Sequence, residues 1–209
     1  MAVKVSVPFL SRRIVLATGN AGKLREMRAI LAVHDLVVVA QSEFGIVPPV
    51  EDGDSFAANA LIKARHAAAI AGLPAIADDS GLEVDALGGR PGLHTARYAG
   101  PQADERANND KLLAELAGVP LSSRDARYRC AMAFVRDAGD AAPIIAEASW
   151  SGRIGFERRG AGGFGYDPLF IVAGSSRTAA EMPEAEKNRV SHRGQALAAL
   201  AAAMRVAGW

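Results

Sequence analysis

A strand, a glycine-containing turn and a helix follow one another near the start of the chain, and this succession constrains the fold most. The apolar run RIVLAT (13–18) is typical of a buried strand and ends at GNAGK. Beyond it, Leu24, Met27 and Leu31 recur at helical spacing. A second apolar run, DLVVVAQ (35–41), then closes a βαβ unit. The sequence therefore predicts an α/β fold.

The other apolar runs predict further strands and helices around the same core. Helices are expected from Ser55 to about Ala71, over 103–117 and over 192–207, and strands at LPAIADD (73–79), LEVDAL (82–87), 126–136, 142–152 and 169–172. The two long strands indicate an antiparallel hairpin. Loops are expected at 45–54, 88–100 and 160–168, and a short acidic segment at 181–188. This pattern predicts a mixed sheet in two lobes with a cleft between them.

Composition excludes several classes of protein. The formal net charge of +1 over 209 residues provides no field for nucleic acid or an anionic membrane. A single cysteine, Cys130, rules out an internal disulfide framework and fits a reducing compartment. No apolar run approaches the roughly 20 residues of a membrane span, and the first residues lack a signal-peptide core. We expect a soluble cytoplasmic protein.

The segment TGNAGK (18–23) lies where the first strand passes into a helix. Free backbone N–H groups and the helix dipole favour an anion at such a position, and Lys23 adds a positive charge. The spacing is not that of a Walker A loop. The alternative is a plain strand-to-helix turn with an asparagine cap.

Two carboxylates, Asp78 and Asp79, end the apolar run AIA. Because successive side chains of a strand point to opposite faces, only one of them is expected to face a given cleft. Mg²⁺ is commonly bound by one or two carboxylates together with substrate phosphates. The alternative is a pair of acids that open a turn at SGL. Asn59 and Lys63 share one helix face, and Glu51 lies in the loop before that helix.

Two further segments could hold a flat ring. The loop GGFGYDP (162–168) carries two aromatic residues among three glycines, although these could equally be core aromatics under a mobile loop. SHRGQAL places His192 and Arg193 in the first turn of a helix capped by Ser191. Cations are unfavourable at a helix N-terminus, which indicates that these side chains recognise something.

Taken in order, LATGNAGKLREM, SFAANALIKA, AIADDSGLEVDALGGRPGLHTARYAG, GGFGYDPLF and EKNRVSHRGQAL resemble the motifs of the inosine triphosphate pyrophosphatase family. The resemblance covers a domain at 13–209 and leaves an N-terminal extension at 1–12. It implies an elongated, twisted mixed sheet with flanking helices, a homodimer, and Mg²⁺-dependent hydrolysis of ITP, dITP and XTP to the monophosphate and pyrophosphate. Such an enzyme cleanses the nucleotide pool and prevents incorporation of these nucleotides into DNA and RNA.

The resemblance also assigns the site residues. Asp79 matches the acid that acts as metal ligand and general base, and Glu51 matches a second metal contact. The residues that would bind the triphosphate are Thr18, Gly19, Asn20, Ala21, Gly22, Lys23 and Lys63, and Ser80 would touch the substrate. The residues that would hold the base are Phe164, Gly165, Tyr166, Asp167, Lys187, His192 and Arg193, with Phe164 stacking on it.

Base specificity is expected at position six of the purine. The carbonyl oxygen of hypoxanthine or xanthine would accept a hydrogen bond from Arg193 or His192, whereas the amino group of adenine would leave donors unpaired. The family usually has Glu where this chain has Ala58; that Glu would complete a capping box with Ser55, or help to organise metal or water. Two alternatives stay open. One is an enzyme of the same fold for other damaged nucleotides, and the other is a non-catalytic nucleotide-binding protein, in which the acid at position 79 would be lost.

Overall fold

One mixed sheet of six strands forms the frame of the molecule. The computed structural model describes residues 12–32 and 36–209. The strand order is β2-β1-β3-β4-β5-β6. The strands are β1 (Arg12–Leu16), β2 (Leu36–Ala40), β3 (Ala75–Val84), β4 (Asp125–Val135), β5 (Ile144–Ile154) and β6 (Phe170–Val172). Strands β2, β1 and β3 are parallel, and β3 to β6 pair antiparallel, so the predicted mixed α/β sheet and its hairpin are confirmed.

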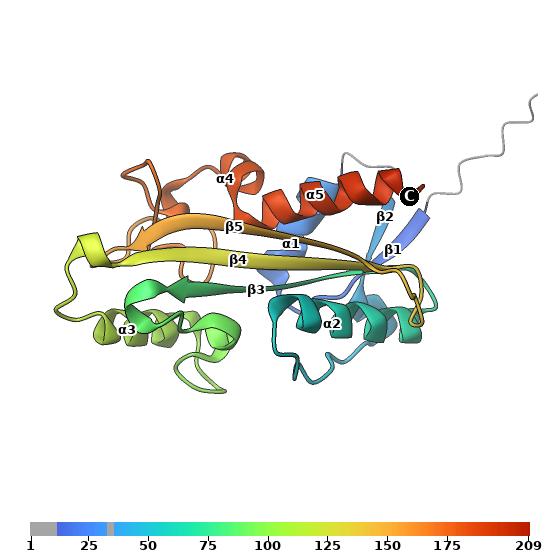
Figure 1. Cartoon of the computed structure of the whole chain (residues 1–209), viewed down its shortest axis with the longest axis horizontal. Helices are drawn as coiled ribbons and strands as arrows, with labels where there is room; N and C mark the ends of the chain where they lie inside the picture. Colours follow the sequence, from blue (N-terminus) through green and yellow to red (C-terminus); the bar gives the residue numbers. More distant parts are fainter. Residues whose placement is uncertain (1–11, 33–35) are drawn as a thin grey trace, which may run out of the picture.

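Five α-helices in the described ranges flank the sheet. They are α1 (Ala21–Leu31), α2 (Phe56–Ala71), α3 (Glu105–Glu115), α4 (Glu184–Val190) and α5 (His192–Val206). In Figure 1, strands β3, β4 and β5 run along an elongated molecule, with α2 and α3 on one side of them and α1, α4 and α5 on the other. The predicted acidic segment contains most of α4, a helix that the sequence did not indicate. Among the helices of the described residues, none combines the length and apolar composition that a bilayer crossing requires.

Three apolar clusters hold these layers together. One lies between the sheet and helices α1 and α5, and includes Ile76 and Leu197. A second lies under α2, where Ala60 and Ala64 let the helix approach the sheet closely. The third fills the far end of the long strands, around Tyr128. Packing at both ends of β3, β4 and β5 gives the two predicted lobes. Apart from Arg12, the predicted extension at 1–12 lies outside the described residues, as does position 35 of the predicted second strand.

The prediction of two separate strands at 73–79 and 82–87 is wrong. A single strand, β3, runs through both acids and pairs with β4 from Ala75 to Val84, and residues 85–87 form a 3₁₀ turn. The glycine that suggested a turn instead permits a close approach, because a Cβ on Gly81 would lie 2.4 Å from the carbonyl oxygen of Gly92. The interpretation in which the two acids open a turn is therefore excluded.

One edge of β3 is interrupted in its middle. Strand β1 pairs with β3 only as far as Ile76, whose carbonyl accepts from the N–H of Ala17 at 2.8 Å. The next hydrogen bond on that edge is donated by the N–H of Leu82 to the hydroxyl of Thr95, also at 2.8 Å. Between them, the edge at Asp78–Ser80 pairs with no strand of the described chain. This gap lies beyond the carboxyl end of β1, where open α/β sheets bind ligands.

Candidate active site

A cavity of about 500 Å³ opens at this gap. It gathers segments far apart in the sequence: the start of α1, the loop before α2, the acids of β3, the loop at 160–168 and the start of α5. The predicted site residues that line it are Thr18, Gly19, Asn20, Lys23, Glu51, Lys63, Asp79, Ser80, Phe164, Gly165, Tyr166, Asp167, Lys187, His192 and Arg193. Ala21 and Gly22 are the predicted residues that do not line it.

The start of α1 has the geometry of an anion site. Asn20 caps the helix and accepts from the N–H of Lys23 at 3.0 Å, and its own N–H donates to the hydroxyl of Thr18 at 3.2 Å. The first turn contains no acidic side chain. The N–H groups of this turn therefore lie beside the cavity with a favourable dipole for a phosphate group.

Gly22 makes room for an aromatic ring. A Cβ at this position would lie 2.7 Å from Cδ1 of Phe164, so any larger residue would displace that ring. Phe164 lines the cavity and Gly22 does not. The absence of a side chain at Gly22 therefore lets the ring of Phe164 pack against the start of α1.

The two acids of β3 point to opposite faces, as strand geometry requires. Asp78 lies on the face of Ile76, toward α1 and α5, and Asp79 lies on the face of Ala77, toward α2. The expectation that only one of them would face the cleft is wrong, because both line the cavity. Since the edge of β3 is open at this point, the cavity extends around that edge to both faces.

Each acid has its own set of partners. Oδ1 of Asp79 accepts from Nζ of Lys63 at 2.7 Å, and Oδ2 accepts from the Asn59 amide at 3.3 Å. Lys63 also donates to Glu51 at 2.9 Å. Asp78 pairs with Lys23 at 2.9 Å on the other face. Asn59 and Lys63 thus share a helix face and act on one carboxylate.

These environments shift the two pKa values in opposite directions. Burial raises the pKa of Asp79, and the neighbouring Lys63 only partly offsets this effect. Burial would also raise the pKa of Asp78, but Lys23 and Arg193 outweigh it and hold that pKa far below its usual range. Asp78 is therefore a permanent anion, and Asp79 is the acid whose proton affinity is increased.

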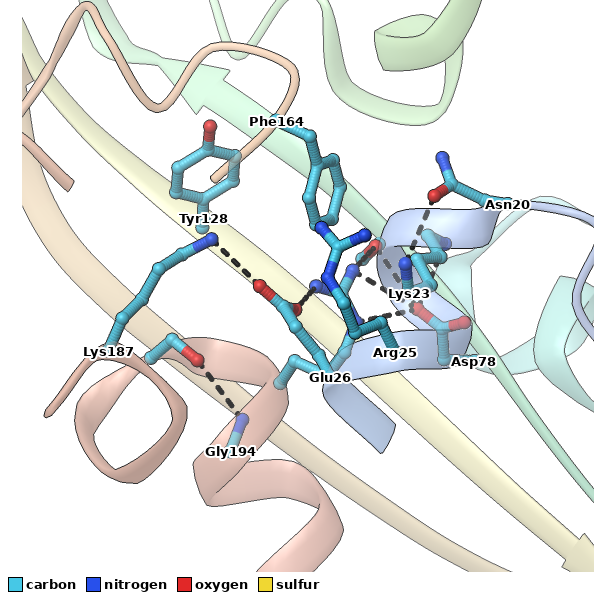
Figure 2. A network of polar contacts seen from close by, with 12 residues as sticks. Asn20, Lys23, Arg25, Glu26, Asp78, Tyr128, Phe164, Lys187 and Gly194 are labelled. Atoms are coloured by element: carbon cyan, nitrogen blue, oxygen red, sulfur yellow. Dashed lines mark hydrogen bonds and ion pairs between the residues drawn. The ribbon is translucent and has the colours of Figure 1, made fainter. Parts of the chain in front are cut away.

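A buried ion network forms the other end of the cavity. Lys187 donates to Asp167 at 2.5 Å and to Glu26 at 2.8 Å, and Arg193 donates to the second oxygen of Glu26 at 2.5 Å. Figure 2 shows the ammonium group of Lys187 directed at the Glu26 carboxylate. The Lys187 ammonium lies 5.0 Å from the centroid of the Phe164 ring, which it flanks.

Arg193 keeps a donor available for a ligand. Its guanidinium donates once to Glu26, twice to Asp78 and once to Ser80. A guanidinium has five N–H donors, so one remains. The cost of a cation at the start of α5 is offset by these carboxylates, and Ser191 caps the helix as predicted.

His192 is neutral in this site. Burial lowers its pKa far below the usual value, and the charges of Arg193 and Lys187 act in the same direction. The ring stacks on Tyr128 at 4.6 Å with 7° between the planes. Nδ1 of His192 is buried and has no hydrogen-bond partner among the described residues.

Two residues of the buried polar network beside the cavity were missed from the sequence. Glu26 lies one helical turn after Lys23, so the i, i+3 spacing to a candidate cation was the available signal. Tyr128 lines the cavity, and its hydroxyl donates to Asp167 at 3.3 Å. It lies in an apolar strand whose sequence is typical of a buried core strand. No local pattern distinguishes it from a packing residue.

Ala58 occupies the third position of α2 and does not line the cavity. Its N–H donates to the hydroxyl of Ser55 at 3.2 Å, which is half of a capping box. This placement favours the capping interpretation of the Glu that the family usually has here.

The fold and the cavity define an α/β protein with a cavity that extends from the N-terminus of a helix to an aromatic wall. The chain belongs to the Ham1 family, whose model matches residues 14–203. It is 58% identical over 196 residues to the dITP/XTP pyrophosphatase of Methylococcus capsulatus, with 94% of this chain and 98% of the relative covered. Identity to the dITP/XTP pyrophosphatase of Escherichia coli O157:H7 is 50% over 194 residues, with 93% and 98% covered.

Solved structures agree with this assignment. A HAM1 protein from Coxiella burnetii superposes with a TM-score of 0.85 at 44% identity, covering 93% of this chain and 98% of that one. A nucleoside-triphosphatase / dITP/XTP pyrophosphatase from Mycobacterium abscessus gives a TM-score of 0.71 at 42% identity, with 90% and 97% covered.

Proposed function

We propose that the chain hydrolyses ITP, dITP and XTP to the nucleoside monophosphate and pyrophosphate, and so keeps these nucleotides out of DNA and RNA. The observation that carries the proposal is a single cavity in which the start of α1 and the acids of β3 lie beside Phe164 and the first turn of α5. The relatives called dITP/XTP pyrophosphatase support the same reaction.

The residues of the cavity fit attack by water on a phosphorus atom. Asp79 is the proposed general base, because its raised pKa brings it closer to neutral pH, where proton acceptance is most effective. Asn59 and Lys63 each hold one of its oxygens and so fix its orientation. Lys23 and the N–H groups of the first turn of α1 would hold phosphate oxygens and neutralise their charge.

Mg²⁺ is the proposed cofactor. Asp79 and Glu51 both contact the ammonium group of Lys63, so their carboxylates converge on one point. The described residues include no group of three or more His, Cys, Asp or Glu side chains that could hold a metal. Two carboxylates completed by phosphates and water are a usual Mg²⁺ shell, and the donor set fits. When bound, the ion would neutralise charge on the phosphates.

Base selection is proposed at the first turn of α5. His192 and Arg193 both line the cavity, and the Arg193 guanidinium lies 5.4 Å from the centroid of the Phe164 ring. One N–H of Arg193 and Nδ1 of His192 have no partner among the described residues. An oxygen at position six of the purine would accept a hydrogen bond there. The amino group of adenine would leave that donor buried and unpaired.

The reaction is tested by release of pyrophosphate from ITP, dITP, XTP, GTP and ATP, with and without Mg²⁺. We expect the three non-standard purines to be hydrolysed far faster than ATP, and only with the metal. Equal rates on ITP and ATP would refute the proposed base specificity. Orthophosphate as the direct product would refute the pyrophosphatase assignment. Substrates with modified pyrimidines in the same assay test the alternative damaged-nucleotide activity.

The general base has a separate test. Asp79→Asn keeps the shape of the side chain but removes its basicity, so turnover of ITP should fall by roughly 10²–10⁴-fold. Binding of ITP, measured by calorimetry, should persist. Asp85→Asn is the matched control, since Asp85 is outside the cavity and, within the part of the chain that the structure describes, pairs only with Arg127. Turnover near the normal rate in Asp79→Asn would assign the base to another residue.

A homodimer and a cytoplasmic location are proposed from the resemblance, with the nucleoside triphosphate as substrate and neither nucleic acid nor membrane as partner. The near-neutral charge of +1 supports the last point. Light scattering after size-exclusion chromatography tests the dimer, and a mass near 21.8 kDa would refute it.

A further inference from the structure

Five lysine and arginine side chains line the cavity, and four of them are already paired with carboxylates. The paired ones are Lys23, Lys63, Lys187 and Arg193. The fifth is Arg97, at the end of the 3₁₀ segment Gly92–Arg97. Its side chain is exposed and forms no hydrogen bond or ion pair with any of the residues described by the structure.

The backbone around Arg97 is firmly held although its side chain is free. Three carbonyl groups on either side of Arg97 accept hydrogen bonds from side chains elsewhere in the same lobe. They belong to Thr95 (from Tyr166, 2.9 Å), Ala96 (from Asn108, 3.1 Å) and Tyr98 (from Lys111, 2.7 Å). A fixed backbone at the cavity wall therefore carries a guanidinium that no protein group uses.

The charged groups that pair with one another in the cavity do not provide the positive charge that a phosphate chain needs, so the unpaired Arg97 becomes important for binding. Four cations face five carboxylates there, those of Glu26, Glu51, Asp78, Asp79 and Asp167, and His192 is neutral. The network thus has one negative charge in excess. Without the proposed Mg²⁺, this network offers a polyanionic ligand no net attraction. Lys23 and Lys63 must exchange a carboxylate for a phosphate oxygen to bind it, whereas Arg97 can bind phosphate without first leaving a carboxylate.

We infer that Arg97 is a substrate-binding residue that contacts the phosphate chain of the bound nucleotide from the lobe opposite α1. The planar guanidinium matches phosphate oxygens with two parallel hydrogen bonds. The inference rests on the proposed function, in which the triphosphate is the strongly anionic part of the substrate.

The test compares Arg97→Gln with Arg106→Gln. Arg106 lies in the same lobe and is highly exposed, and among the described residues its side chain pairs only with Asp110, at 4.0 Å. Its substitution therefore removes an equal charge away from the cavity. Arg97→Gln should lower kcat/KM for ITP by roughly 10- to 100-fold, the usual range for a charged hydrogen bond. Arg97→Lys should recover part of this loss, and Arg106→Gln should match the wild type.

Product inhibition locates the contact. The inhibition constant of pyrophosphate should rise about as much as kcat/KM falls, and that of inosine monophosphate should change less than about twofold. An unchanged constant for pyrophosphate, or a rise for the monophosphate alone, would overturn the inference. Thermal unfolding should be the same for Arg97→Gln and the wild type, because the Arg97 side chain has no hydrogen-bond or ion-pair partner among the described residues.

Calorimetry with inorganic tripolyphosphate separates this inference from the proposed function, because it requires no turnover. Weaker binding by Arg97→Gln than by Arg106→Gln supports the contact even if the wild type hydrolyses no nucleotide tested. Equal binding by the two variants refutes it even if the wild type is an active pyrophosphatase.

Discussion

Asp78 and Asp79 are adjacent in sequence, yet they have opposite pKa shifts because they lie on opposite faces of β3. The lowered pKa makes Asp78 a fixed counter-ion for Lys23 and Arg193, and the raised pKa makes Asp79 a candidate base. Environments that separate the pKa values of neighbouring acids are a recurrent way of assigning their roles. Strand alternation, which can be predicted from the sequence, is the origin of this difference.

Glu26 is the residue whose importance depends most on tertiary structure. Burial would raise its pKa, but Arg193 and Lys187 outweigh this and lower it. Its stabilising effect is therefore present above the ordinary glutamate pKa of about 4.3 and is lost as pH falls through the lower folded value. Glu26→Gln should lower the free energy of unfolding at pH 7 by about 3 kcal/mol, because two buried cations each lose a partner.

Urea denaturation over a pH series measures this effect. Below about pH 4.3 the unfolding free energy of Glu26→Gln should fall less steeply with acidification than that of the wild type. Glu184→Gln is the control, because Glu184 is exposed and its ion pair with the exposed Arg25 is long, at 3.8 Å. Parallel pH profiles for wild type and Glu26→Gln would show that the buried pairs contribute no linked stability.

Most helices and strands could be predicted because their signals are local. Ser55 caps α2 and Ser191 caps α5 where the sequence indicates, and both helices end close to their predicted residues. Helix α4 could not be predicted, since it has only seven residues and no apolar repeat. The error in β3 has a similar cause, because a glycine that permits a close approach looks the same in sequence as one that permits a turn.

Gly81 provides the test at the level of the strand. Gly81→Ala should lower the free energy of unfolding by about 1–3 kcal/mol, because the new Cβ would collide with the backbone of Gly92 and force β3 and the 3₁₀ segment apart. Gly139→Ala is the control, because its nearest neighbour would be 3.5 Å away. A stability of Gly81→Ala equal to that of the control, measured by urea denaturation, would contradict the close packing.

At the level of the whole molecule, motif order and fold class could be predicted, whereas the pairing of charges in the cavity could not. The contacts of Lys187 with Glu26 and of Arg193 with Asp78 join residues more than a hundred positions apart. Such contacts depend on how α1, β3 and α5 pack together in the fold. The spacing of residues within a short sequence segment does not determine this packing. The sequence motifs identify the candidate site residues, but only the structure shows which charged groups pair with one another.

A ligand that contacts both lobes should stabilise the whole chain. For Asp79→Asn, which keeps the nucleotide intact, ITP with Mg²⁺ at about 100 times its dissociation constant should add roughly 2.7 kcal/mol. For a chain of this size that corresponds to a rise in Tm of about 5–10 °C in differential scanning calorimetry. ATP at the same concentration should give a smaller rise, and equal rises would contradict base selection in the cavity.

The interrupted edge of β3 also bears on self-association. An unpaired strand edge is normally a template on which another chain can add and aggregation can begin. Here the gap covers only Asp78–Ser80 and is closed by Ala17 on one side and Thr95 on the other, so an extended peptide cannot align along it. The gap therefore opens onto a cavity of a size that suits a small molecule, and its two closed ends protect it from another protein strand.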